Sequence, residues 1–267
     1  MIQDETWDSE NGERLWQEMR TLSHDKDPEL GRLLGARKLA AFRRSAWCGP
    51  RRRAQNPISL RIHRESGGTW RGRGEWKTDT RNNIRRDQLG LCAYCERPLP
   101  TAFEIDHFHP MGVPKCTEQT NMPDDGNWAL TWTNLFGVCD VEGQLINDVH
   151  GCNDVKQNND WCDEIVHPLS KRRPATSAFR VAPDGTLVVR SDYRDPIRAQ
   201  CTIDRLQLQR LAAQRKAFRD EVESRVQVVE ASEVLRALLT NSPQFITTIA
   251  SPFGEDAVVR ALQEHRS

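Results

Sequence analysis

A short run near the middle of the chain, residues 104–110, places a carboxylate beside an imidazole, because Asp106 and His107 are neighbours. This pair at the end of an expected strand suits hydrolysis, in which one group holds a metal ion and the other takes a proton from water. Asn153 and Lys156 follow three residues apart at an expected helix start, so both side chains can face the same point. The Asn153 amide oxygen can complete an oxygen-ligand site with Asp106, and the Lys156 ammonium can contact a phosphate.

Four cysteines around this run have the spacing of a structural zinc site. Cys92 and Cys95 are separated by two residues, which lets both thiolates bind one zinc ion. Cys139 and Cys152 follow within zinc-site range, and four sulfurs would close a tetrahedral site. Cys201 has no partner at metal spacing and is interpreted as a plain thiol. Because thiolates select zinc and oxygen ligands favour Mg²⁺ or Mn²⁺, the sequence predicts two ions with separate tasks.

Other ligands compete with these assignments. Cys116 and Cys162 are lower-ranked alternatives for completing the zinc site. His150 lies beside Cys152 and could replace Asn153 as a metal ligand. The residues alone therefore leave the last zinc ligand and the second ligand of the oxygen site open.

Length and composition place these residues in a folded chain. The protein has 267 residues, of which 37% are hydrophobic and 28% are charged, enough for one large domain or two small ones. No stretch approaches the roughly 18 consecutive apolar residues that a membrane helix needs. The acidic, polar start lacks the basic end and apolar run of a secretory signal. We therefore expect a cytoplasmic protein whose cysteines are reduced.

The net charge of zero, from 38 basic and 38 acidic side chains, hides a division along the chain. Residues 32–86 are rich in arginine, whereas residues 104–164 are rich in acids. A basic segment beside an acidic one is expected of a protein that binds a polyanion in one place and a cation in another. Charged helix faces that only keep the protein soluble would give the same charge pattern. The candidates for contact with a nucleic-acid backbone are Arg71, Arg73, Arg85 and Arg86.

Hydrophobic periodicity and turn residues predict the elements that must position these side chains. Residues 1–53 are expected to form a helical N-terminal extension, and residues 59–63 a short strand. Residues 183–185, Pro-Asp-Gly, are of types that favour a hairpin turn, and they lie between two apolar runs. The other predicted elements are a helix over 78–89, hairpin strands at 178–181 and 186–189, one long or two shorter helices over 202–239, and a short helix over 256–264.

Aromatic residues near the central run are interpreted mainly as core. Trp128, Trp132 and Phe136 are expected to be buried. Trp70 and Trp76 lie among arginines, so stacking on single-stranded bases is a weaker alternative for them.

At the residues of the central run the sequence resembles the HNH endonuclease superfamily, whose ββα-metal motif is flanked in many members by two cysteine pairs. The order, the spacing and the residue types agree together. The resemblance implies that Asp106 is a metal ligand, His107 the general base and Asn153 the second metal ligand. It also implies that Asn134 is the central asparagine that braces the loop, and that His109 touches phosphate or supports the base.

The wider pattern, over roughly residues 57–218, is similar to the PtuB-type HNH proteins of Septu and certain retron antiphage systems. The similarity rests on Leu91–Glu96, Asp106–Phe108, Asn134–Phe136, Cys152-Asn153, the hairpin at Gly185 and Thr202–Leu206. It implies a DNA endonuclease whose partner is an ABC/SMC-like ATPase of the PtuA type, joined in retron systems by a reverse transcriptase and its msDNA.

The resemblance also implies a fold class and a mechanism. We expect an α+β protein in which a ββα-metal core with a four-cysteine zinc site, residues 54–170, lies between the N-terminal extension and a region of hairpin and helices, residues 171–267. Hydrolysis would use His107 as the base and a single Mg²⁺ or Mn²⁺ ion. Two rivals remain: a zinc-stabilised nucleic-acid or protein adaptor without cleavage, and a free-standing restriction-type nuclease without a partner.

Overall fold

The computed structural model describes residues 56–112, 127–139, 151–169, 178–226, 233–235, 237–238 and 244–248. All of them lie in the second of two compact units of the chain, Trp47–Ser267. The predictions for the N-terminal extension, for the helix over 256–264, and for Cys116 and His150 lie outside the described residues.

Helix α4 (Glu75–Asp87) supplies one wall of the core. The predicted helix over 78–89 is confirmed, with its start three residues earlier. Trp76, Thr80 and Ile84 recur every four residues and are buried, which gives α4 one face toward the interior. Because Trp76 is buried, it does not present an open surface on which a base could stack.

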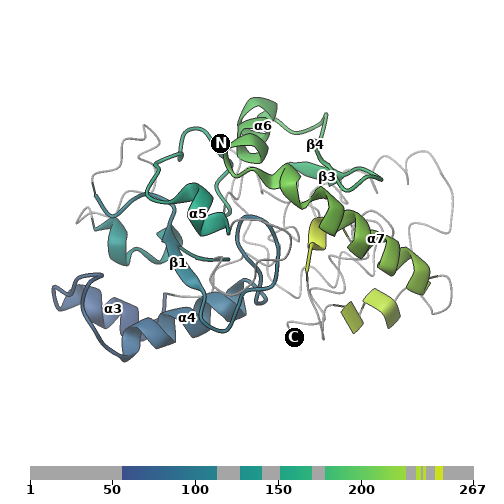
Figure 1. The fold of residues 1–267 in the computed structure, drawn as a ribbon. Coiled ribbons are helices and arrows are strands. Elements are labelled where there is room, and N and C mark those ends of the chain that lie inside the picture. The colour runs from purple at the N-terminus through teal and green to yellow at the C-terminus, as the bar shows by residue number, and fades with distance from the viewer. Residues whose placement is uncertain are drawn as a thin grey trace, which may run out of the picture. The chain divides into compact units, whose positions relative to one another are not determined.

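The predicted strand over 59–63 is wrong, because these residues lie in helix α3 (Ile58–Glu65), which packs against α4 (Figure 1). The alternation of Leu60 and Ile62 is compatible with one apolar strand face. In the helix, however, Leu60 is buried and Ile62 is exposed. Two apolar residues in so short a window fit both the two-residue period of a strand and the 3.6-residue period of a helix. The burial of Leu60 against the core therefore selects the helix.

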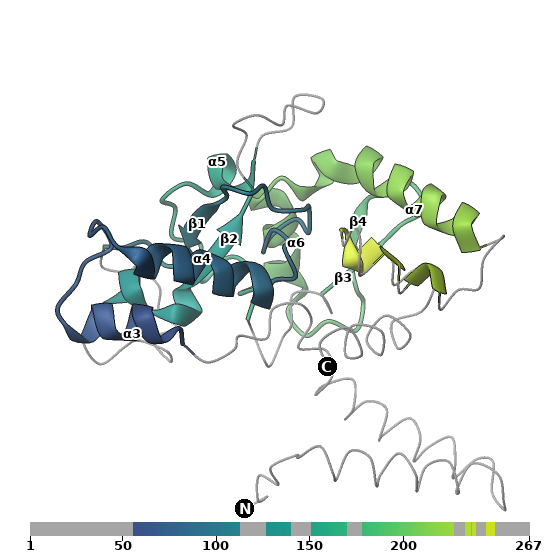
Figure 2. The same cartoon turned by 90° about the horizontal axis from the view of Figure 1, so that it is seen from below.

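The central sheet pairs two antiparallel strands, β1 (Glu104–His107) and β2 (Leu135–Val138). In their register Asp106 lies opposite Phe136, and His107 lies opposite the first residue of β2. Figure 2 shows the two strands beside α4, which contacts β2. Every residue of β2 is buried, as expected for a strand covered on both faces.

Gly137 in β2 allows this close packing. A Cβ atom at Gly137 would lie 2.8 Å from the side chains of both Ile84 and Phe103. The side chain of Gln88 donates from Nε2 to the Gly137 carbonyl and accepts from the Gly137 N–H, both at 2.9 Å. The amide of Gln88 therefore pairs with the backbone of β2 as a neighbouring strand would.

Helix α5 (Cys152–Lys156) follows the sheet and gives the order ββα (Figure 2). Its start is stabilised because Gly151 N–H donates to the Asp154 carboxylate at 2.9 Å. Two short 3-10 helices, Trp128–Leu130 and Trp132–Asn134, lead into β2. The strand pairing puts the end of β1 beside the start of β2. Lys156, at the end of α5, reaches the same region, because its ammonium donates to Asp106 and to the His107 carbonyl.

The predicted hairpin is confirmed by the antiparallel pairing of β3 (Phe179–Val181) with β4 (Leu187–Val189). Gly185 in its turn has a φ of 85°, a conformation that favours glycine. The carboxylate of Asp184 accepts the backbone N–H of Thr186 at 3.0 Å and so closes the turn.

The helical region that follows is interrupted. Asp195 caps its first helix, whose first residue is a proline, so this helix starts before the predicted position. Gln207 has a φ of 49° and ends it. The elements are α6 (Pro196–Arg205), a 3-10 helix (Leu208–Leu211) and α7 (Ala212–Val226). The described part of the predicted stretch over 202–239 therefore contains the end of α6, the separate helix α7 and further helical residues at 233–235 and 237–238, and not one continuous helix.

Helices with two small sheets make the described region an α+β structure, as predicted. Its buried apolar side chains form one cluster that joins α4, the central sheet, the hairpin and the two last helices. Trp128, Trp132 and Phe136 belong to the interior, as predicted. We find no helix in this region that is long and apolar enough to cross a membrane.

Candidate functional site

Four cysteines from three parts of the chain meet in the core. Cys92 and Cys95 come from the turn after α4, Cys139 follows β2, and Cys152 begins α5. Their Sγ atoms all lie within 4.8 Å of one another, and those of Cys95 and Cys139 are 3.6 Å apart. All four side chains are buried. The structure thus brings together the four cysteines that the sequence analysis selected.

The spacing of these sulfurs fits a zinc ion. Zn–S bonds of about 2.3 Å place the sulfurs of a tetrahedral site about 3.8 Å apart, near the separation of Cys95 and Cys139, whereas a disulfide needs about 2.05 Å. Burial raises the pKa of the Cys92 thiol well above its ordinary value, so a Cys92 thiolate needs a cation beside it. Arg97 Nη2 also donates to Cys139 Sγ at 3.2 Å. The cluster can therefore bind zinc.

The turn Cys92–Cys95 is anchored on two sides. Ala93 N–H donates to the Gly137 carbonyl at 3.0 Å, which ties the turn to β2. The carboxylate of Glu96 accepts from the backbone N–H of Thr247 at 2.9 Å and from its hydroxyl at 2.8 Å. Residue Thr247, near the end of the chain, thus braces the residue that follows the cysteine turn.

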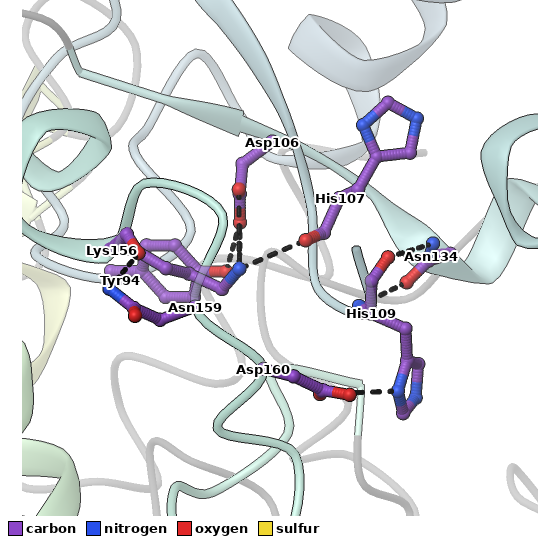
Figure 3. Close-up of polar contacts among 8 residues, drawn as sticks. All are labelled: Tyr94, Asp106, His107, His109, Asn134, Lys156, Asn159 and Asp160. Atoms are coloured by element: carbon purple, nitrogen blue, oxygen red, sulfur yellow. Dashed lines mark hydrogen bonds and ion pairs between the residues drawn. The ribbon is translucent and has the colours of Figure 1, made fainter. Parts of the chain in front are cut away.

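Asp106 in β1 faces a buried ammonium and a phenol (Figure 3). Lys156 Nζ lies 3.3 Å from each carboxylate oxygen and donates to the His107 carbonyl at 2.9 Å. The Tyr94 hydroxyl donates to Asp106 Oδ2 at 2.5 Å. Burial raises the pKa of Asp106, while the charge of Lys156 and the hydrogen bond from Tyr94 oppose the rise. The ionised carboxylate therefore depends on the cation beside it.

The imidazole of His107 points away from the carboxylate of Asp106, because neighbouring strand residues face opposite sides (Figure 3). Its Nε2 lies 3.0 Å from the Ala129 carbonyl, so Nε2 carries the proton and Nδ1 keeps a lone pair. Trp70 packs edge-on against the ring, with centroids 4.5 Å apart. Burial, aided by the charge of Lys156 and opposed by the bond to Ala129, lowers the pKa of His107 to about 4. At neutral pH this imidazole is a neutral base.

Asn134 ties the loop after β1 to the segment before β2. Its buried side-chain oxygen accepts the His109 N–H at 2.7 Å. Its amide nitrogen donates to the carbonyls of His109 and Trp128, both at 2.9 Å. Because these bonds use backbone groups on both sides, the conformation of the loop that carries His109 is fixed by one side chain.

The side chains of Asn153 and Lys156 were expected to face the same point, but their surroundings differ. The Asn153 N–H donates to the Cys139 carbonyl at 3.2 Å, and within the described residues its side chain forms no hydrogen bond. Lys156, one turn later, is buried on Asp106 instead of reaching a surface where a phosphate could bind. The ligand role of Asn153 and the phosphate contact of Lys156 stay predictions.

A hard divalent ion suits the oxygen atoms of this site by chemistry. Carboxylate and amide oxygens, as on Asp106 and Asn153, are the ligands that Mg²⁺ and Mn²⁺ prefer. The positive charge beside Asp106, however, belongs to Lys156. A divalent ion bound to Asp106 would therefore have to take the place of this ammonium.

The four arginines predicted to contact DNA fall into two groups. Arg71, Arg73 and Arg86 are exposed. Arg85 is half-buried, and its guanidinium donates to the backbone carbonyls of residues 99–101. Arg85 is therefore engaged in holding the loop after the cysteine turn, whereas the other three are open to solvent.

Tyr94 is a site residue that the sequence analysis did not select. It lies inside the cysteine turn, and the turn is bonded to β2, so its hydroxyl reaches the neighbouring strand at Asp106. The available signal was its position between Cys92 and Cys95, which the zinc interpretation treated as a spacer.

No family model matches the chain, but a curated protein is similar to part of it. The chain is 31% identical, over 141 aligned residues, to an Escherichia coli protein named "Retron Ec83 putative HNH endonuclease". The match covers 44% of this chain and 48% of that protein, so the chain spans about half the length of the curated relative it matches. This similarity, beside a ββα order and a cysteine cluster able to bind zinc, supports a relationship to the HNH superfamily.

Proposed function

We propose that this protein is a metal-dependent HNH-type endonuclease that hydrolyses DNA phosphodiester bonds with His107 as the general base. The observation that carries the proposal is the neutral, buried imidazole of His107, with Nε2 held by the Ala129 carbonyl and a lone pair on Nδ1. The relative named as an HNH endonuclease supports the same reaction class.

The base acts through its fixed tautomer. Nδ1 of His107 accepts a proton from the attacking water, and the positive charge that forms strengthens the hydrogen bond from Nε2 to Ala129. Because the pKa of His107 is about 4 in the protein without substrate, its ring is deprotonated at neutral pH and can accept a proton. The negative charge of a bound phosphate would raise this pKa and so favour proton transfer. Trp70 holds the ring from one side.

The oxygen ligands and Lys156 have linked tasks. A Mg²⁺ or Mn²⁺ ion held by Asp106 and Asn153 would supply Lewis-acid stabilisation of the charge on the phosphate and on the leaving oxygen. Lys156 leaves the Asp106 carboxylate in that state, which frees its ammonium to contact a phosphate oxygen. The Tyr94 hydroxyl keeps the carboxylate in place throughout.

Zinc in the four-cysteine cluster has a structural task in this proposal. The cluster joins the turn after α4, the end of β2 and the start of α5, so the ion would hold α5 against the sheet. Arg71, Arg73 and Arg86 are exposed and would contact the DNA backbone. His109, which is buried, would support the loop beside the base instead of reaching the phosphate.

We further propose that the nuclease serves cytoplasmic antiphage defence together with an ABC/SMC-like ATPase of the PtuA type. The resemblance of residues 57–218 to PtuB proteins supports this partner. The retron name of the E. coli relative supports an association with a reverse transcriptase and its msDNA.

Cleavage of plasmid and single-stranded DNA, with Mg²⁺ or Mn²⁺ and with or without the co-purified partner, tests the proposal. We expect His107→Ala to abolish cleavage while zinc content and circular dichroism stay unchanged. His63→Ala is the matched control, because the His63 ring also contacts a backbone carbonyl, at 3.0 Å, and belongs to α3. Undiminished cleavage by His107→Ala would remove this residue from the mechanism.

A second candidate function, a zinc-stabilised adaptor without cleavage, is favoured by one observation. The Lys156 ammonium already neutralises Asp106, as it would permanently in a site that no longer binds a divalent ion. An adaptor would bind DNA or the ATPase in the absence of Mg²⁺ and would leave DNA intact under every metal condition. Metal-dependent cleavage by the wild type decides against it.

A further inference from the structure

Among the described residues, a second group of side chains with the geometry to hold a metal ion lies outside both sites described so far. It consists of His109, in the loop after β1, and of Asp160 and Cys162, in the loop after α5. One nitrogen, oxygen or sulfur ligand atom from each of them lies within 4.8 Å of those of the other two. Neither the Cys92–Cys95 turn nor Asp106 contributes an atom to this group.

The distances favour a shared ion over a direct hydrogen bond. His109 Nδ1 and Asp160 Oδ1 are 3.9 Å apart, beyond hydrogen-bond range (Figure 3). Zinc bonds of about 2.1 Å to nitrogen and oxygen place two such ligands about 3.4 Å apart in a tetrahedral site. A closure of about half an ångström would therefore seat an ion between these two atoms, which without an ion attract each other only when His109 is protonated.

The His109 ring is held in place before any ion binds. Asn134 bonds the backbone N–H and carbonyl of His109, which fixes the backbone from which the ring extends. The His109 ring packs on Trp128, with centroids 4.3 Å apart, and edge-on against Phe108, at 5.3 Å. These contacts direct Nδ1 toward Asp160, as Figure 3 shows. A preorganised ring of this kind is typical of a ligand supported by its surroundings.

The donor chemistry selects the type of ion. An imidazole nitrogen, a carboxylate oxygen and a thiolate sulfur together suit a borderline-soft divalent ion such as Zn²⁺, and not Mg²⁺. The side chains of His109 and Asp160 are 9% and 8% exposed, and Cys162 is buried as well. A carboxylate and a thiolate would balance the two positive charges of the ion, which makes such burial favourable.

We propose that His109 Nδ1, Asp160 and Cys162 Sγ bind a second zinc ion, separate from the four-cysteine cluster, with the fourth position open to water. The ion joins the loop after α5 to the loop after β1. It therefore holds the end of α5, where Lys156 lies, close to the strand that carries Asp106. This assignment does not depend on whether the protein cleaves DNA.

Metal content of the purified protein tests the assignment. After saturation with Zn²⁺ and removal of loosely bound metal, we expect inductively coupled plasma mass spectrometry to find two zinc ions per wild-type chain. Cys162→Ser and Asp160→Asn should each retain one. Cys201→Ser is the matched control, because Cys201 is a free thiol on α6 outside both groups, and it should retain two.

Cobalt substitution separates the loss of the site from a failure to fold. In Co²⁺-loaded protein, the difference spectrum between wild type and Cys162→Ser should show the charge-transfer band of a single thiolate, with the bands of the four-cysteine cluster unchanged. One zinc ion in the wild type, or two in both Cys162→Ser and Asp160→Asn, would overturn the proposal. The retained cluster spectrum shows that each variant is folded around its first ion.

Discussion

The ammonium of Lys156 lies 3.3 Å from both carboxylate oxygens of Asp106, and the two side chains are 0% and 5% exposed. Removing one partner of a buried pair leaves an uncompensated charge and costs about 3–5 kcal/mol. We expect Lys156→Met to lower the free energy of unfolding by about that amount in denaturant titrations with zinc present.

Lys216→Met is the control for this experiment. Lys216 Nζ lies 2.5 Å from Asp220 on α7, but both side chains are about half exposed, at 52% and 53%. Loss of such a surface pair should change the free energy of unfolding by less than about 1 kcal/mol. Equal losses in the two variants would show that burial gives the Lys156 pair no special importance.

The lowered pKa of His107 predicts a loss of stability in acid. This pKa is about 4 in the folded protein and about 6.5 in the unfolded chain. As the pH falls from 6.5 toward 4, the unfolded chain binds a proton that the folded protein does not, so stability falls, by up to about 3 kcal/mol at the lower end. His107→Gln removes this contribution. Denaturant titrations at several pH values should therefore give a shallower decline for the variant; parallel curves would show that the ring titrates freely.

Much of the secondary structure could be predicted because its signals are local. The helix expected over residues 78–89 and the hairpin with its turn at Gly185 were both predicted from nearby residues and were both found. The strand expected at residues 59–63 failed for the opposite reason. Its two apolar residues fit either period, and only the tertiary contact that buries one of them selects the helix.

Side-chain partners were harder to predict than positions. Helical spacing shows that Asn153 and Lys156 share a face, but not which of them reaches Asp106. The long lysine side chain can cross the buried space to the carboxylate, and this reach depends on how α5 is placed against β1. The proximity of His109 to Asp160 likewise depends on how two separate loops are placed against each other. No local sequence pattern predicts that placement.

Zinc removal should unfold the central region. The four-cysteine cluster joins three separate segments, so its ion contributes directly to folding. We expect Cys95→Ser to lose zinc from this cluster and to melt well below the wild type, or to be insoluble, and we expect Cys201→Ser to keep the wild-type zinc content and melting temperature. Calorimetry and metal analysis provide the readout. A Cys95→Ser protein with normal zinc and normal melting would contradict the assignment.

Gly137→Ala tests the packing of α4 on the sheet. The new methyl group would lie 2.8 Å from the side chains of Ile84 and Phe103, and overpacking of this kind costs about 1–3 kcal/mol. Gly112→Ala is the control, since nothing lies within 4 Å of its added Cβ atom. Denaturant titration should show a loss for the first variant alone. Comparable stabilities would mean that helix and strand can separate slightly without a penalty.

Exposed arginines near the proposed base predict how DNA binding responds to salt. Arg71 and Arg73 follow directly after Trp70 in the chain, and the Trp70 ring contacts His107. DNA that reaches the proposed base would therefore pass close to both arginines. Each phosphate contact contributes about 0.9 to the slope of log binding constant against log salt concentration. We therefore expect the double variant Arg71→Gln/Arg73→Gln to reduce the magnitude of this slope by about 2, measured by fluorescence anisotropy.

The control for the salt experiment removes the same charge from another surface. Lys216 and Arg225 are exposed on α7, where each pairs with a carboxylate four residues away. The double variant Lys216→Gln/Arg225→Gln should keep the wild-type slope. Side chains that do not contact DNA displace no counterions from it, so their removal leaves the salt dependence of binding unchanged. If both double variants reduced the slope equally, overall charge would account for the effect. The arginines beside Trp70 would then have no special place in DNA binding.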